Sequence, residues 1–223
     1  MKLAAQDSVT GIDGEFGQMA VEVGRHAWGL PQLSMREKAF IFIAADLHAH
    51  LLGFPLESHV AMARSHGVPM AAMREAVRHL APYVGYPCSF EALMRLKEIA
   101  SGDDDHATDA SATEDNAGSG EEPARLDPGA LAAMRGLDPD FADFFANQFA
   151  QRWNRPGLSV RERALATIAT DVLGGSLEDS FRLHVELARA HGSDDDAIRA
   201  VLLLVAEFGV SKAWRAYAAL QRL

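Results

Sequence analysis

The sequence predicts an all-α fold built from two copies of one helical unit. Apolar residues recur at helical spacing along most of the chain, and no stretch alternates with period two for long enough to form a strand. In addition, residues 28–67 recur at residues 153–192, 125 positions later and without a gap, with about seventeen identities in forty positions. A repeat of this kind indicates an internal duplication, which sets the architecture before any single residue is interpreted.

The identities include polar and aromatic positions as well as small and apolar ones. They fall, among others, at Trp28/Trp153, Pro31/Pro156, Ser34/Ser159, Arg36/Arg161, Glu37/Glu162, Asp46/Asp171, His59/His184 and His66/His191. We therefore expect a first repeat over residues 14–100 and a second repeat over residues 127–223.

Helices separated by Gly and Pro breaks are expected in the first repeat, whereas residues 1–13 have little pattern and are expected to fray. The run from Ala39 is apolar on nearly all sides, which predicts a buried central helix. The expected helices are Glu15–Trp28, Ala39–Leu52, Leu56–His66, Met70–Tyr83 and Phe90–Ile99.

A capping box precedes the central helix in both repeats. In Ser34-Met-Arg-Glu37 the Ser hydroxyl can accept from the amide three residues on, while the Glu carboxylate reaches back to the cap. Ser159-Val-Arg-Glu162 repeats the pattern. These residues are therefore interpreted as the start of a helix rather than as catalytic groups.

The second repeat follows an acidic stretch. Residues 101–126 hold eight carboxylates against one Arg and almost no large apolar side chain, which predicts a flexible acidic linker. The expected helices after it are Pro128–Met134, Phe141–Trp153, Arg163–Leu173, Phe181–His191 and Ala197–Leu220.

Composition excludes several classes of function. A net charge of −10 argues against nucleic-acid and anionic-membrane partners, which require clustered Lys and Arg. The single Cys88 excludes an internal disulfide, and no secretion signal or membrane span is seen. We expect a cytoplasmic protein with a small-molecule substrate.

The order of these motifs resembles the carboxymuconolactone decarboxylase family, which shares its fold with the alkylhydroperoxidase AhpD. The resemblance rests on Leu33–Glu37, on His59, on Ala63–Gly67 and on His79–Leu93, and it extends over roughly residues 14–99 and 138–220. It implies an AhpD-like helical bundle without a cofactor. Because single-copy members form hexamers, it also implies that a fused pair forms a homotrimer.

This chain departs from the family in two ways. AhpD-like relatives carry Cys-x-x-Cys before the family's His, but no thiol precedes His59 or His184, and Cys88 stands alone. A thiol peroxidase is therefore not expected. About three more residues also separate Glu37 from His59 than in many members, which weakens a direct transfer of the decarboxylase's substrate.

Asp46 and His59 are the first candidates for catalysis. His59 is the family's His, and Asp46 lies in an apolar helix where an unpaired carboxylate is costly. Asp46 could orient a neighbouring imidazole or act as a base. Its counterpart Asp171 equally favours a purely structural hydrogen bond between helices.

Residues kept only in the first repeat are the second group of candidates. His48, His79 and Tyr83 are replaced by Leu173, Leu204 and Phe208, so we expect the working pocket in the first repeat. His79 and Tyr83 lie at i and i+4 on one helical face. The expected substrate-binding residues are Tyr86, Phe42, Leu52 and Phe54.

A metal site is not expected, because Asp46, His48, His50 and His59 lack the spacing that places ligands on one helical face. The leading hypothesis is a cofactor-independent lyase acting on a small carboxylate or lactone, with His59, His79 and Tyr83 moving protons. No Arg clamp for the carboxylate is evident beyond the candidates Arg64, Arg74 and Arg78. The alternatives are an isomerase, cyclase or dehydratase acting on a lipophilic intermediate, and a non-catalytic binding module.

Overall fold

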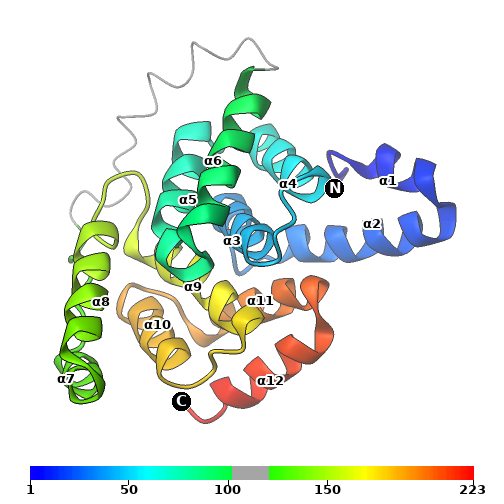
Figure 1. Ribbon diagram of the computed structural model, residues 1–223. Helices are drawn as coiled ribbons and strands as arrows, with labels where there is room; N and C mark the ends of the chain where they lie inside the picture. Colours follow the sequence, from blue (N-terminus) through cyan, green and yellow to red (C-terminus); the bar gives the residue numbers. More distant parts are fainter. Residues whose placement is uncertain (102–120) are drawn as a thin grey trace.

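The computed structural model describes residues 1–101 and 121–223, which form α-helices, one short 3-10 helix and connecting turns (Figure 1). The all-α prediction is confirmed. No helix within these two ranges is long and apolar enough to cross a lipid bilayer. Most of the predicted acidic linker, residues 102–120, lies outside the described residues.

Each helix of the second repeat has a counterpart 125 positions earlier. The first repeat contains α1 Gln6–Ile12, α2 Gly14–Gly29, α3 Met35–His48, α4 Phe54–Ser65, α5 Met70–Val84 and α6 Tyr86–Ser101. The second contains α7 Pro128–Leu137, α8 Pro139–Arg152, α9 Val160–Gly174, α10 Asp179–Ala190, α11 Asp195–Val205, the 3-10 helix η2 Ala206–Phe208 and α12 Val210–Leu220.

The central helices α3 and α9 pack against each other and form the core (Figure 1). Every residue of α3 from Glu37 to Leu47 is buried, as is every residue of α9 from Glu162 to Leu173. Both predicted capping boxes are present at the start of these helices. A helix that is apolar on all sides is expected to be enclosed by other helices, and both central helices are enclosed in this way.

The Arg of each capping box joins the two repeats. Arg36 Nε donates to Glu162 Oε1 at 2.6 Å, and Arg161 Nε donates to Glu37 Oε1 at 2.6 Å. All four side chains are no more than about a quarter exposed. The motif that begins each helix therefore also ties it to its counterpart through a reciprocal pair of ion pairs.

The fifth helix of each repeat crosses to the other repeat. In addition to its own neighbours, α5 packs on α9, and α11 packs on α3. This exchange decides which residues meet in the site, because a residue on α5 lies beside the second repeat's central helix. The α1–α2 and α7–α8 pairs extend on opposite sides of the molecule (Figure 1).

The expectation that residues 1–13 fray is wrong. Residues 6–12 form α1, which packs on α2, and the Asp13 carboxylate caps α2 by accepting from the Phe16 amide at 2.8 Å. Asp138 caps α8 in the same way through the Phe141 amide. The two segments Gly-Ile-Asp-Gly-Glu-Phe16 and Gly-Leu-Asp-Pro-Asp-Phe141 show that the duplication extends to the N-terminal helix.

The expected continuous helix Ala197–Leu220 is also wrong. It is interrupted after Val205 by η2 and Gly209, and α12 begins at Val210. The corresponding break in the first repeat falls at Gly85, whose φ of 94° is a conformation that favours glycine. The break turns Glu207 and Phe208 toward the first repeat.

Candidate functional site

A buried carboxylate–imidazole pair joins α3 to α4. Asp46 is fully buried, and its Oδ2 lies 2.7 Å from His59 Nδ1. The other oxygen, Oδ1, has no hydrogen-bond partner. Burial raises the pKa of Asp46 above its ordinary value, although the hydrogen bond from His59 and its charge act in the opposite direction. The pair fixes the imidazole so that Nε2 remains for a ligand.

Aromatic rings hold the His59 imidazole from one side. The Phe42 ring stacks on it with centroids 4.3 Å apart, and Trp28 stacks on Phe42 at 4.7 Å. Phe42 is fully buried and Trp28 is 3% exposed. The imidazole plane is therefore set by packing as well as by Asp46.

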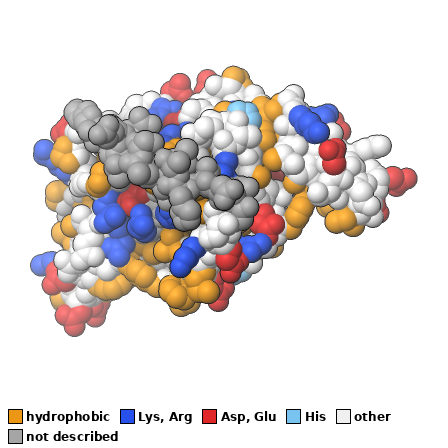
Figure 2. All heavy atoms as spheres, turned by 90° about the horizontal axis from the view of Figure 1, so that it is seen from above, with side chains coloured by type: hydrophobic (Ala, Val, Ile, Leu, Met, Phe, Trp, Pro, Cys, Tyr) orange, Lys and Arg blue, Asp and Glu red, His pale blue; other side chains and the backbone are white. Residues whose placement is uncertain are grey.

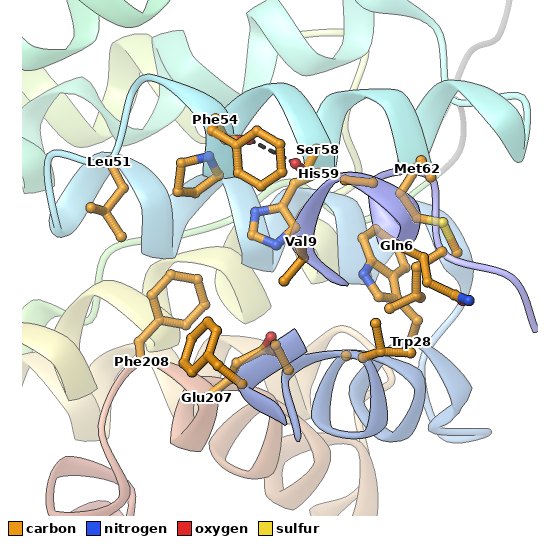
Figure 3. A pocket seen from close by; sticks show the side chains of 18 of the residues that line it. Gln6, Val9, Trp28, Leu51, Phe54, Ser58, His59, Met62, Glu207 and Phe208 are labelled. Atoms are coloured by element: carbon orange, nitrogen blue, oxygen red, sulfur yellow. Dashed lines mark hydrogen bonds between the residues drawn. The ribbon is translucent and has the colours of Figure 1, made fainter. Parts of the chain in front are cut away.

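His59 faces a cavity of about 480 Å³ (Figure 3). The first repeat contributes Trp28, Leu51, Phe54 and Met62, the N-terminal segment contributes Leu3, Gln6 and Val9, and the second repeat contributes Glu207 and Phe208. Within the part of the chain that the structure describes, the lining contains neither Lys nor Arg. The cavity is thus a largely apolar space with two titratable side chains, His59 and Glu207.

Glu207 reaches the cavity from η2, opposite the α4 wall that carries His59 (Figure 3). Burial is the main cause that raises the pKa of its carboxyl, and the Asp46 charge acts in the same direction. The His59 charge acts against both. Such a carboxyl keeps its proton to higher pH than a solvated Glu, so it can serve as an acid.

The second repeat contains the equivalent pair, and both of its side chains are almost fully buried. Asp171 Oδ2 lies 2.6 Å from His184 Nδ1, and Ser180 Oγ donates to Asp171 Oδ1 at 2.7 Å. Trp153 stacks on His184 at 5.6 Å, and Tyr83 meets the same imidazole edge-on at 5.3 Å. His184 is 1% exposed, and its Nε2 has no partner.

His79 and Tyr83 therefore lie at the second pair, not with His59. His79 Nε2 is 2.9 Å from Thr167 Oγ1, and the Tyr83 hydroxyl accepts from Trp153 Nε1 at 2.9 Å. Burial lowers the pKa of His79 well below its ordinary value and raises the pKa of Tyr83. The expected grouping of His59, His79 and Tyr83 in one pocket is wrong, because α5 crosses onto α9.

Comparison with known proteins supports the resemblance. Residues 139–222 match the sequence model of the carboxymuconolactone decarboxylase family. The likeness to the carboxymuconolactone decarboxylase family model is thus confined to the second repeat. The match covers the repeat with the sealed His184–Asp171 pair, whereas the His59 cavity is built mainly by the other repeat.

A solved structure extends the likeness to nearly the whole chain. The crystal structure at 1.70 Å resolution of a provisionally named gamma-carboxymuconolactone decarboxylase subunit from Burkholderia xenovorans LB400 is 21% identical, with a TM-score of 0.57. The alignment covers 99% of this chain and 92% of the other. At this identity the likeness establishes a shared fold. No curated protein sequence matches the chain.

The remaining predicted site residues are dispersed. Phe42 and Phe54 lie at the His59 cavity, but Leu52 packs against the core instead. His48 lies beside Gly174 at the end of α9, where burial lowers its pKa. Tyr86 is on α6, with its hydroxyl hydrogen-bonded to Gln148 and Arg152.

Cys88 lies inside the fold and does not line the His59 cavity. It is buried, and its Sγ donates to the Leu47 carbonyl oxygen at 3.2 Å. Burial raises the pKa of the thiol, so the reactive thiolate is disfavoured. The prediction that this cysteine takes no part in thiol exchange agrees with that environment.

Four parts of the site were not predicted from the sequence: Glu207, Phe208, Trp28 and the N-terminal helix. Glu207 carried a usable signal, because it follows the apolar run Val201–Ala206 much as Asp46 follows its own. No pattern in the sequence predicts that α5 packs on α9 and α11 on α3. Without knowledge of this crossing, Glu207 could not be assigned to the pocket of His59.

Proposed function

We propose that the chain is an enzyme that moves a proton within a neutral, lipophilic small molecule bound in the His59 cavity. The observation that carries this proposal is the placement of His59 and Glu207 in one apolar cavity whose lining lacks Lys and Arg. An isomerisation or dehydration needs a base and an acid near the same substrate. It does not need a cation to neutralise a carboxylate.

In this proposal each side chain has one task. Asp46 accepts from His59 Nδ1, so that Nε2 is the nitrogen that removes a proton from substrate. Glu207, whose pKa is raised, serves as the acid and returns a proton at a second atom. Phe42 and Trp28 hold the imidazole plane, while Phe54 and Phe208 contact the apolar body of the substrate.

A carboxy-lyase is the second candidate, because the matching family model bears the name of a decarboxylase. Loss of CO₂ leaves an enolate-type anion, to which an acid must return a proton at carbon. Glu207 could supply that proton. The absence of Lys and Arg from the lining favours the first candidate, since a bound carboxylate would face only partial dipoles and another acid.

The sealed second pair bears on the non-catalytic alternative. His184 and Asp171 keep the same hydrogen bond although both side chains are almost fully buried, so the pair by itself can serve structure alone. What distinguishes His59 is the cavity and the acid opposite it. Catalysis is therefore proposed only for the first pair.

The test is to incubate the protein in D₂O with cyclic enones, unsaturated neutral lactones and 4-carboxymuconolactone. Proton NMR follows exchange and isomerisation, and trapped CO₂ reports decarboxylation. We expect exchange into the neutral compounds, lost in His59→Gln. CO₂ release without exchange would replace the proposal by the carboxy-lyase. Tight binding with neither reaction would support the binding module instead.

We also propose that the chain forms a homotrimer, as the resemblance to the family implies. Large apolar side chains are exposed on the two extended helix pairs, and apolar patches reach the face seen in Figure 2. Exposed apolar surface of this kind is typical of contact between subunits. The exposed residues on the extended pairs include Ile12, Phe16, Met19, Leu137, Phe141 and Phe144.

A further inference from the structure

A second cavity, of about 470 Å³, lies between α5, α6 and α8 and shares no lining residue with the His59 cavity. Three Arg side chains line it: Arg78, Arg152 and Arg155. Among the described residues, the lining contains no carboxylate. In a chain with a net charge of −10, this is an unusual concentration of positive charge.

A single carboxylate, that of Glu75, neutralises part of the positive charge of the cavity. Glu75 accepts from Arg155 Nε at 2.8 Å and lies 3.4 Å from Arg78. The same carboxylate also accepts from Arg163 at 3.2 Å. One carboxylate thus serves several guanidinium groups, whereas Arg152 is held by the uncharged Tyr86 hydroxyl and Gln151.

A buried hydroxyl in the wall of the cavity has no partner. Ser89 is 3% exposed, and its Oγ forms no hydrogen bond. A buried polar atom left unpaired costs free energy, so its retention beside three Arg side chains points to a ligand. The neighbouring Phe90 and Leu93 add an apolar wall.

The duplication provides an internal comparison. The positions equivalent to Arg78, Arg152 and Arg155 in the other half are Leu203, Ala27 and Leu30. The three Arg side chains are therefore not required by the helical repeat itself. They occur together on only one of the two faces that the duplication produced.

We propose that this cavity binds a small organic molecule through a single oxyanion, a carboxylate or a phosphate monoester. Arg152 and Arg78 would bind the anion, since guanidinium groups match both anions in geometry and charge. Ser89 would donate its hydroxyl proton, and the apolar body would lie on Phe90 and Leu93. The site is independent of the chemistry proposed at His59.

The test is isothermal titration calorimetry on the full chain with benzoate, phenyl phosphate, inorganic phosphate and benzyl alcohol. We expect benzoate or phenyl phosphate to bind with one site per chain, and the tighter of the two identifies the anion. Arg152→Gln should weaken that binding at least tenfold. The matched control Arg199→Gln, an exposed Arg paired with Asp196 in the other half, should leave it unchanged.

Several results would overturn the proposal. These are the absence of binding by both organic anions, equal binding of benzyl alcohol, binding of inorganic phosphate as tight as phenyl phosphate, or equal loss in Arg152→Gln and Arg199→Gln. Ser89→Ala is the second variant. It should weaken anion binding while leaving the melting temperature unchanged or higher, because it removes an unpaired buried hydroxyl.

Discussion

At the scale of single residues, the candidate site depends on two carboxyl groups near His59: Asp46, which is fully buried, and Glu207, which is exposed at the cavity. Asp46 and Glu207 both have pKa values raised chiefly by burial, and each lies close enough to His59 to feel its charge. In Asp46 the hydrogen bond to His59 offsets part of that burial. Glu207 faces the cavity, where the proton can be exchanged with a substrate.

The raised pKa of Glu207 predicts a specific dependence of stability on pH. Below the ordinary pKa of a Glu, about 4.3, both folded and unfolded chains hold the proton and the group contributes nothing. Between that value and the raised folded pKa, the unfolded chain is ionised while the folded chain still holds the proton, so the folded state loses stability as pH rises. Glu207→Gln cannot ionise and should escape this loss.

Urea unfolding of wild type and Glu207→Gln at several pH values between 4 and 8 measures the effect. The variant should gain in free energy of unfolding relative to wild type as pH rises. The exposed Glu186→Gln is the control and should show no such trend. A difference between Glu207→Gln and wild type that stays constant with pH would contradict the raised pKa.

At the scale of elements, features that depend on neighbouring residues could be predicted from the sequence, whereas contacts between distant helices could not. Both capping boxes and the buried central helices were predicted, because Ser34 and Glu37 interact within one turn and apolar residues cover all faces of α3. The positions of His79, Tyr83 and Glu207 were not predicted. They follow from the packing of α5 on α9 and of α11 on α3. Local spacing holds no information on such an exchange.

Helix α1 was missed for a related reason. It is short and has no buried residue, and a helix of that length is marginal by itself in water. Its contacts with α2 stabilise it, and Val9 faces the His59 cavity. The N-terminal helix is therefore part of the binding wall.

Two substitutions on α1 test that assignment. Val9→Asp places a charge in the cavity wall and should weaken binding of a neutral apolar ligand about tenfold, equivalent to about 1.4 kcal/mol. Ser8→Asp, at an exposed position on the same helix, should leave affinity unchanged. Fluorescence titration with an apolar dye measures both. Equal effects of the two substitutions would place α1 outside the binding wall.

At the scale of the whole molecule, the two repeats form one interdependent body. Arg36 and Arg161 bridge them reciprocally, and each His–Asp pair is completed by residues of the other repeat. Duplication allowed the two sites to diverge. One opened into a cavity that contains Glu207, while the other closed over His184 with Tyr83 and Trp153.

The trimer proposed for this molecule predicts its mass in solution. Light scattering coupled to size exclusion should give about three times the chain mass of 24.1 kDa. Replacing the exposed Phe16 and Phe141 with Asp should lower that mass, because a charge in an apolar subunit contact is costly. A wild-type mass of one chain at micromolar concentration would contradict the trimer.

The most direct measurement compares the two histidines that the duplication produced. His59→Gln and His184→Gln remove equivalent imidazoles, and the rate of substrate proton exchange in D₂O is measured for each under conditions where both are folded. General acid–base catalysis typically contributes about 10²–10⁴-fold, so His59→Gln should lose activity on that order. His184→Gln should retain a rate near wild type. Loss of exchange in His184→Gln with retention in His59→Gln would contradict the account.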